Sequence, residues 1–138
     1  MHALSNASLG TPWPKVQRLE GAMTNALSST DDEAALVARL FDALSDRRQP
    51  VDEELPDTGV GLARERMLSP AFIGSPDGRY GTRCSTVLIG ERQGARWRIR
   101  LAERSFDPQG RAVEERTVHL DGWPAAATPP PVQVKPLR

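Results

Sequence analysis

A change in the spacing of apolar residues along the chain is the feature that most constrains its fold. Before residue 46 these residues recur every three or four positions, which is the repeat of an α-helix. After residue 79 they alternate with polar residues, which is the repeat of a half-buried β-strand. Because 138 residues have room for one ordinary domain, the sequence predicts a single α+β fold in which helices precede a sheet.

Two helices are predicted in the first part of the chain. The first begins at Pro14, a residue favoured in the first helical turn, and carries an apolar stripe as far as Ser28. Thr30 and Glu33 have the spacing of a capping box, which predicts the start of a second helix that ends in the segment 46–50. The second helix has a broad apolar face made of Leu36, Val37, Leu40, Phe41 and Leu44.

Three antiparallel strands are predicted in the second part, at residues 82–89, 96–101 and 111–120, joined by turns at 90–94 and 107–110. The middle strand has the clearest alternation. Its apolar residues are predicted to face the core, and its arginines are predicted to form a solvated ladder with nearby glutamates. The alternative for these arginines is an anion site. The two sets are Trp97, Ile99 and Leu101, and Arg96, Arg98 and Arg100.

Prolines mark two further stretches. Residues 50–79 form a proline- and glycine-rich connection around the segment 62–68, and long connections inside a domain are often functional. The C-terminal stretch, residues 123–138, is predicted to be an extended or disordered tail, because proline cannot donate a backbone hydrogen bond to a helix or sheet.

The charge balance excludes several classes of partner. Eighteen lysines and arginines balance eighteen acidic residues, so the chain has no net field to attract nucleic acid or an anionic membrane. No apolar run reaches the roughly 18 residues that a membrane-spanning helix needs. The single cysteine, Cys84, cannot form an internal disulfide, which favours a reducing compartment. We therefore expect a cytoplasmic protein with no nucleic-acid partner and no membrane span.

The residue types that carry catalysis or bind metals are sparse. No neighbour in the sequence would activate Cys84 as a nucleophile, so we interpret it as a packed residue of the first strand. His2, His119 and Cys84 are too scattered to predict a metal site. We predict no catalytic residue and no metal ligand in this chain.

Arg83 differs from the other charged residues. It follows a glycine-rich loop and enters the first strand between small hydroxyl residues, in the segment Tyr80–Thr86. An arginine at a strand end can bind a carboxylate through two parallel hydrogen bonds. An ordinary structural salt bridge explains the same pattern, and the residues alone do not decide between the two.

Six short segments occur in a characteristic order: Leu4–Asn6, Thr11–Val16, Leu55–Val60, Ser69–Ile73, Tyr80–Val87 and Glu103–Asp107. Together they resemble the NRDE family, which includes the transport and Golgi organisation protein 2 homologues. The resemblance spans residues 2 to 120, and its specificity comes from the order of the segments rather than from any one of them.

The resemblance implies a fold and a pair of site residues. The family is thought to have the N-terminal-nucleophile hydrolase architecture, with two antiparallel sheets between helical layers. This implies a partial sandwich of that kind, with two helices and an antiparallel meander in this chain. Eukaryotic relatives have been linked to haem trafficking. Asn6 and Arg83 resemble residues that face the family's pocket, and we take both as candidate ligand-binding residues.

The start of the chain departs from the family pattern. Family members usually open with Met-Cys and carry an Asn-Arg-Asp-Glu segment soon afterwards, whereas this chain has His2 at the second position. The free amine of an N-terminal nucleophile serves as the base for its own side chain, and histidine is not a nucleophile of that class. We therefore interpret residues 1–122 as the C-terminal half of such a domain, without independent catalysis.

Three functions are consistent with this interpretation. The first is a truncated NRDE-family protein concerned with haem handling, in which haem is a ligand rather than a resident cofactor. The second is an amide hydrolase that acts when an N-terminal half is supplied. The third is a small module that binds haem or another acidic ligand through its arginines.

The half-domain interpretation also predicts how the chain behaves alone. A sheet in such a sandwich is covered on both faces, and two helices can cover only one. We therefore expect a marginally stable chain that self-associates or binds an N-terminal half. The apolar residues that two helices cannot all cover are Val87, Ile89, Trp97, Ile99 and Leu101.

Overall fold

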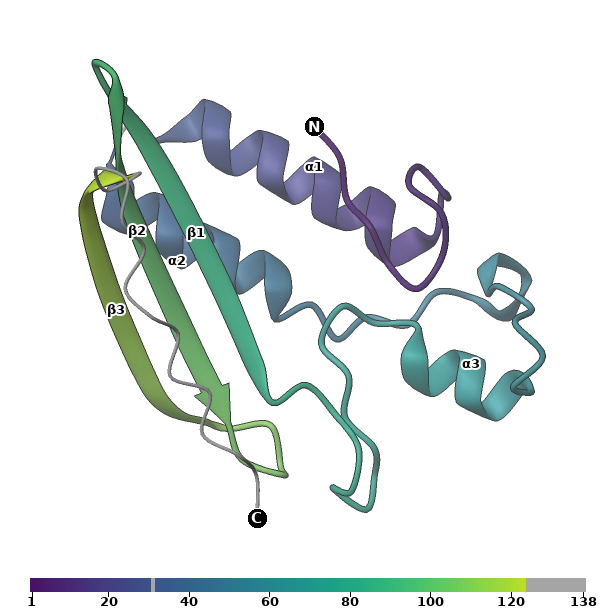
Figure 1. The fold of residues 1–138 in the computed structure, drawn as a ribbon. Helices are drawn as coiled ribbons and strands as arrows, with labels where there is room; N and C mark the ends of the chain where they lie inside the picture. The colour runs from purple at the N-terminus through teal and green to yellow at the C-terminus, as the bar shows by residue number, and fades with distance from the viewer. Residues whose placement is uncertain (31, 124–138) are drawn as a thin grey trace, which may run out of the picture.

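The computed structural model describes residues 1–30 and 32–123, and their α+β fold confirms the predicted class (Figure 1). Helices α1 and α2 lie together on one side of the sheet, and α3 lies farther from the strands, past the C-terminal end of α2. The elements are α1 (Pro14–Ser29), α2 (Glu33–Leu44), the 3-10 turn η1 (Asp52–Glu54), α3 (Leu62–Leu68), β1 (Cys84–Gln93), β2 (Arg96–Phe106) and β3 (Ala112–Trp123). Among residues 1–30 and 32–123, no helix has the length and apolar character needed to cross a membrane.

Two predicted stretches differ from the expectation or fall outside the described residues. The segment 62–68, expected among short turns, is a helix of two turns, so the described residues contain three α-helices rather than the two predicted. Trp123, the first residue of the expected tail, is the last residue of β3. The rest of that tail, residues 124–138, lies outside the described residues.

The N-termini of the two long helices are stabilised in different ways. Pro14 is the first residue of α1, as predicted, where its missing N–H leaves no helical hydrogen bond unmade. The capping box predicted for α2 is wrong. The N-cap is Asp32, whose carboxylate accepts a hydrogen bond of 2.7 Å from the N–H of Ala35. Thr30 instead accepts a hydrogen bond from the N–H of Asp32, and the carboxylate of Glu33 pairs with arginines of the sheet.

The strands pair in the antiparallel order β1-β2-β3 that a meander requires. All ten residues of β1 pair with β2 without interruption, so the predicted loop at 90–94 shrinks to a turn at Gly94 and Ala95. Gly94 has a φ of 65°, a left-handed conformation that glycine adopts readily. β3 pairs less regularly, with two register shifts along β2. β1 itself begins at Cys84, two residues later than predicted.

The core lies between α2 and the sheet. Phe41 is 1% exposed and Ala102 is fully buried, and both pack with Val37 and Val87. Val87 and Ala102 are paired across β1 and β2, so they present one apolar patch to the helix. The guanidinium carbon of Arg104 lies 4.3 Å from the centre of the Phe41 ring, a cation–π contact at the margin of this core.

The two sets of side chains on the middle strand, β2, face the opposite sides of the sheet from those predicted. Arg98 and Arg100 point toward α2, where both approach the carboxylate of Glu33, and Arg100 Nη1 lies 2.9 Å from Glu33 Oε1. Arginine is tolerated on this side because Glu33 compensates its charge and its aliphatic stem packs on apolar surface. The apolar residues of the strand therefore face away from the helices: Trp97, Ile99 and Leu101.

The face of the sheet away from α1 and α2, which we call the open face, carries rows of apolar side chains. The rows are Leu88, Leu101 and Val118, then Ile99 and Leu120, then Trp97 and Trp123. Leu88 is 62% exposed and Trp97 is 41% exposed. This confirms that the described helices do not cover the whole predicted apolar set. Val87 and Ile89, in contrast, pack in or against the core.

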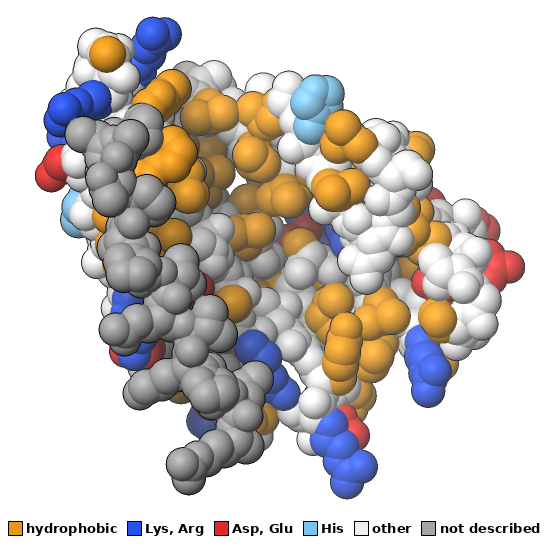
Figure 2. Space-filling view, viewed as in Figure 1, with side chains coloured by type: hydrophobic (Ala, Val, Ile, Leu, Met, Phe, Trp, Pro, Cys, Tyr) orange, Lys and Arg blue, Asp and Glu red, His pale blue; other side chains and the backbone are white. Residues whose placement is uncertain are grey.

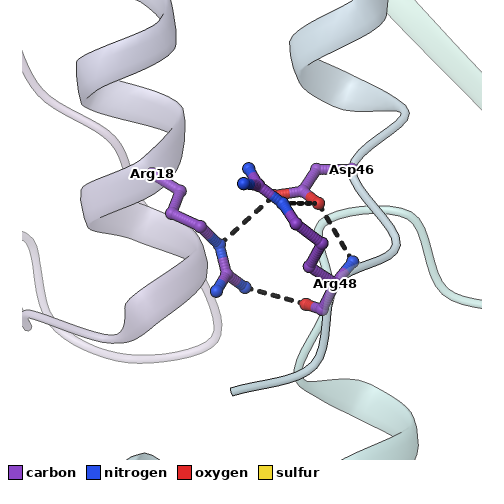
Figure 3. A network of polar contacts seen from close by, with 3 residues as sticks. All are labelled: Arg18, Asp46 and Arg48. Atoms are coloured by element: carbon purple, nitrogen blue, oxygen red, sulfur yellow. Dashed lines mark hydrogen bonds and ion pairs between the residues drawn. The ribbon is translucent and has the colours of Figure 1, made fainter.

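Three charged residues tie α1 to the end of α2 (Figure 3). Asp46 accepts a hydrogen bond of 2.8 Å from Nε of Arg48, and its other carboxylate oxygen lies 3.2 Å from Nε of Arg18 in α1. Arg18 Nη2 also donates to the backbone carbonyl of Arg48 at 2.8 Å. The side-chain hydrogen bond from Arg48 lowers the pKa of Asp46, so the carboxylate is ionised at neutral pH and the network is intact there.

Candidate functional site

A short hairpin in the long connection places Arg83. Residues 73–82 fold back on themselves, and the N–H of Thr82 donates to the carbonyl of Ile73 at 2.9 Å. Gly74 and Gly81 form a bridge between the two arms. A Cβ at Gly81 would lie only 2.8 Å from the carbonyl oxygen of Ile73, so this close approach requires glycine. The connection is therefore a folded turn that leads directly into β1.

Arg83 spans the gap between this hairpin and the turn that joins β2 to β3. Its Nη2 donates to the carbonyl of Gly78 at 2.9 Å, and its Nη1 donates to the carbonyl of Asp107 at 3.3 Å. Its own backbone carbonyl accepts a hydrogen bond of 2.9 Å from the N–H of Phe106. The exposed guanidinium is thus held by two backbone carbonyls, and no carboxylate of the described residues forms the salt bridge considered from the sequence.

A second arginine, Arg47, reaches the same place from the end of α2. Its guanidinium carbon lies 3.9 Å from the centre of the Phe72 ring, and its Nη2 donates to the carbonyl of Gly110 at 2.9 Å. Phe72 is buried and meets Phe106 edge to face, with 4.7 Å between the ring centres. A ring face and a backbone carbonyl therefore fix the position of Arg47 without a carboxylate.

Arg47 and Arg83 line one pocket of 330 Å³, which we call the arginine pocket. Its walls are the hairpin at 73–83 and the turn at 107–110. Four of its lining residues are glycines, and Gly78 and Gly110 have the positive φ of tight turns, which allows a ligand to approach the backbone closely. Among the lining residues that the structure describes there is no histidine, cysteine or methionine.

Two carboxylates also line the arginine pocket, but both are engaged locally. Asp107 pairs with Arg111 at 2.8 Å, and Asp77 pairs with Arg79 at 3.7 Å. The backbone N–H of Arg111 is the main cause that lowers the pKa of Asp107, and a hydrogen bond from the Ser75 hydroxyl lowers the pKa of Asp77. Both acids are therefore ionised partners in local ion pairs, and Arg47 and Arg83 supply the remaining positive charge of the pocket.

Asn6 lines a different pocket of 230 Å³, which we call the tryptophan pocket. Its walls are largely apolar and include Trp13 and Tyr80. Ile73 lines both pockets. The structure therefore places the two residues carried over from the family resemblance in neighbouring pockets and does not bring them together in one.

Two charged residues of the tryptophan pocket were not predicted. Lys15 Nζ donates to the carbonyl of Leu68 at 2.9 Å and lies 5.6 Å from the centre of the Trp13 ring. Burial lowers the pKa of Lys15, and the negative charge of Glu65 acts in the opposite direction. Glu65 is 6% exposed and accepts hydrogen bonds from the N–H and the hydroxyl of Thr58. No sequence motif joins Lys15 and Glu65, because they lie in α1 and α3, which are far apart in the sequence.

The remaining candidate residues lie apart from both pockets. Cys84 is exposed, so its interpretation as a packed residue is wrong, because it lies on the open face. Cys84 pairs with Ser105, and His119 pairs with Arg100. The cysteine and the histidine therefore lie at different positions along the strands. Among residues 1–30 and 32–123, no group of three metal-ligating side chains lies close together.

Comparison with known proteins agrees with the resemblance read from the sequence. A sequence model of the family described as Transport and Golgi organisation 2 matches residues 1–108, and this range contains Asn6, Arg47 and Arg83. The match covers most of the 138 residues, so the chain belongs to the Transport and Golgi organisation 2 family. No curated protein matches the chain, and no solved structure matches it either.

Proposed function

We propose that this chain binds a small molecule that carries a carboxylate, and that the arginine pocket holds the acidic group. The supporting observation is that Arg47 and Arg83 share one pocket and that neither has a carboxylate partner among the described residues. Most other arginines of the described chain are paired with an acidic side chain: Arg18, Arg48, Arg66, Arg79, Arg98, Arg100, Arg104, Arg111 and Arg116.

The chemistry of the guanidinium group supports an anionic ligand. Each guanidinium has five N–H donors in a rigid fork. Arg83 uses two of its N–H groups and Arg47 uses one in hydrogen bonds to carbonyls, so donors remain for a carboxylate. Because the backbone and the Phe72 ring already hold both side chains, little side-chain entropy is lost when a ligand binds.

The family resemblance implies haem as the ligand of this pocket. We propose that its propionate groups bind Arg47 and Arg83 and that the iron is not ligated there, since the described lining has no axial ligand type. The pocket volume of 330 Å³ is near the lower end of about 300–1,000 Å³ for ligand sites. Most of the ring would therefore lie outside the pocket, which suits transfer of the ligand.

The location of the protein is a separate proposal. The cytoplasm, as a reducing compartment, suits the exposed thiol of Cys84.

Titration with three porphyrins tests this proposal. Haem and iron-free protoporphyrin should bind with similar affinity, because both carry free propionates. The dimethyl ester of protoporphyrin should bind weakly, because it keeps the ring but has no free carboxylate. Tight binding of the ester, or binding that requires iron, would contradict the proposal.

Arginine variants locate the binding site. Arg47→Ala and Arg83→Ala should each lose about 1.5–3 kcal/mol of binding free energy, the range for a hydrogen bond to a charged group. This corresponds to roughly ten- to hundredfold in Kd. Arg92→Ala is the matched control, because Arg92 is an exposed arginine that also donates to a carbonyl, that of Gly94, outside both pockets. An equal loss in the control would remove the arginine pocket from consideration.

A further inference from the structure

We propose that the tryptophan pocket is a second ligand site, which holds a small zwitterion, an α-amino acid with an apolar side chain. In this assignment Lys15 binds the ligand's carboxylate and Glu65 binds its ammonium group, while the apolar walls receive the side chain. The site does not use Arg47 or Arg83, so the inference is independent of the function proposed above.

Glu65 keeps a free acceptor in this pocket although the residue is almost fully buried. It is 6% exposed, and the two hydrogen bonds that it accepts, from the N–H and the hydroxyl of Thr58, both end at Oε1. Among the described residues, no group donates to Oε2. A buried carboxylate depends on hydrogen-bond donors to replace its hydration, so Oε2 is an acceptor for an N–H of a ligand.

Lys15 keeps free donors in the same pocket. Its Nζ donates to the carbonyl of Leu68 at 2.9 Å, and an ammonium group has three N–H donors in all. Burial lowers the pKa of Lys15, and the negative charge of Glu65 offsets only part of that effect. Because burial disfavours the charged form of the amine, an anionic group placed beside it is stabilising. Lys15 is therefore suited to a ligand carboxylate.

The two opposite charges do not neutralise each other directly. In the described structure Lys15 donates to a backbone carbonyl and Glu65 accepts from Thr58, and no ion pair joins the two side chains. A ligand with one charge of each sign can bind both groups at once. A ligand with a single charge is attracted by one group and repelled by the other. The pair therefore favours a zwitterion, and an α-amino acid carries both charges on one carbon.

The walls of the pocket define the rest of the ligand. Trp13 and Tyr80 supply aromatic surface, and the remaining walls are mostly apolar: Pro14, Pro50, Pro56, Val60, Leu68 and Ile73. The volume of 230 Å³ is below the range of about 300–1,000 Å³ for sites that hold drug-sized molecules. The occupant is therefore small, and its side chain is apolar.

An apolar groove elsewhere in the molecule offers a contrast. Figure 2 shows hydrophobic side chains gathered around a hollow between the sheet and α1. The groove of 180 Å³ that α1, α2 and β1 line has no charged lining residue, so nothing in it orients a zwitterion. The tryptophan pocket differs because a fixed cation and a fixed carboxylate stand among its apolar walls.

Four ligands test the charge pattern on the full 138-residue chain. L-Phenylalanine has both charges and a ring, 3-phenylpropionate lacks the ammonium group, phenethylamine lacks the carboxylate, and glycine lacks the ring. In an NMR titration, the backbone amide of Thr58 reports on the tryptophan pocket, and those of Gly78 and Gly110 report on the arginine pocket. Phenylalanine should shift the Thr58 signal, and each of the other three ligands should bind about tenfold more weakly or worse.

Two variants identify which group recognises which charge. Lys15→Met keeps the length of the side chain without its ammonium group, so phenylalanine and phenethylamine should bind with similar affinity. Glu65→Gln removes the negative charge, so phenylalanine and 3-phenylpropionate should bind with similar affinity. Arg39→Met and Glu54→Gln are the matched controls, because both change exposed residues outside the pocket, and they should keep the full preference for phenylalanine.

Four results would overturn the proposal. They are equal binding of the single-charge ligands to the unmodified chain, shifts confined to Gly78 and Gly110, no shift of Thr58 up to about 10 mM phenylalanine, and an unchanged preference in folded Lys15→Met and Glu65→Gln. If either variant does not fold, the four ligands on the unmodified chain still decide the outcome.

Discussion

The two faces of the sheet come from the same three strands but differ in what covers them. On the helix-covered face, Val87 and Ala102 are buried beneath Phe41. On the open face, Leu88 and Trp97 remain largely exposed to solvent. The alternation of apolar residues and arginines along β2 therefore separates two sets of side chains but does not identify the set that faces the core. Here the arginine-bearing set faces the helices, because α2 supplies Glu33 as a partner.

Truncation of Phe41 should give the largest difference between the faces. Phe41→Ala removes a side chain that is 1% exposed and should cost about 3–5 kcal/mol of unfolding free energy. Leu88→Ala, on the open face, should cost less than about 1 kcal/mol, because its side chain is already mostly in water. Urea unfolding followed by circular dichroism measures both. Similar losses would mean that the open face is covered in solution.

The Glu33 pair should give the next largest effect. Glu33→Gln leaves Arg100, on the helix-covered face, without its charged partner and should cost about 1 kcal/mol, since the pair is only partly exposed. Glu114→Gln removes a more exposed pair, with Arg116 on β3, and should have almost no effect. Equal unfolding free energies for the two variants would show that Glu33 does not hold the arginines against α2.

The order of the elements could be predicted from the sequence because it depends on local patterns. Pro14 begins α1 as expected, and the change from helical to strand repeat correctly separates the helices from the meander. The boundaries were less accurate. The cap of α2 depends on Asp32, and β1 continues through the glycine at position 90 because Gly94 makes the turn instead.

The pockets could not be predicted because they depend on contacts between distant segments. Arg47 was interpreted only as part of the end of α2, and its position is set by Phe72 and Gly110. Lys15 and Glu65 line the same pocket, where Lys15 donates to the Leu68 carbonyl at the end of α3, and the segment 62–68 was not assigned as a helix. Arg83 lies beside a glycine-rich turn, as the sequence indicated, but its partners are backbone carbonyls, which no sequence pattern reveals.

Acid should weaken the helical layer that covers one face. Because the pKa of Asp46 is lowered in the folded state, its ionised form stabilises the fold above its ordinary pKa of about 3.9. That contribution disappears as the pH falls through the lower, folded-state pKa. Asp46→Asn should therefore reduce the unfolding free energy at neutral pH, and the difference from the unmodified chain should shrink in acid. Glu54→Gln removes an exposed acid without an ion pair in the described structure and should change the unfolding free energy at neutral pH by less than about 0.5 kcal/mol.

The smallest change in stability should come from placing a charge on the open face. Leu120 is 47% exposed and pairs with Ile99 in the middle of that face. Leu120→Lys should change the unfolding free energy by less than about 0.5 kcal/mol, because the lysine stem can cover the same neighbours while its ammonium group stays in water. Binding of a fluorescent dye that reports apolar surface should fall, because the charge interrupts the apolar rows.

Thr117→Lys adds the same charge on the other face and should leave dye binding unchanged. A loss of about 2 kcal/mol or more in Leu120→Lys, together with a change in sedimentation, would show that the open face is buried in an oligomer rather than exposed to solvent.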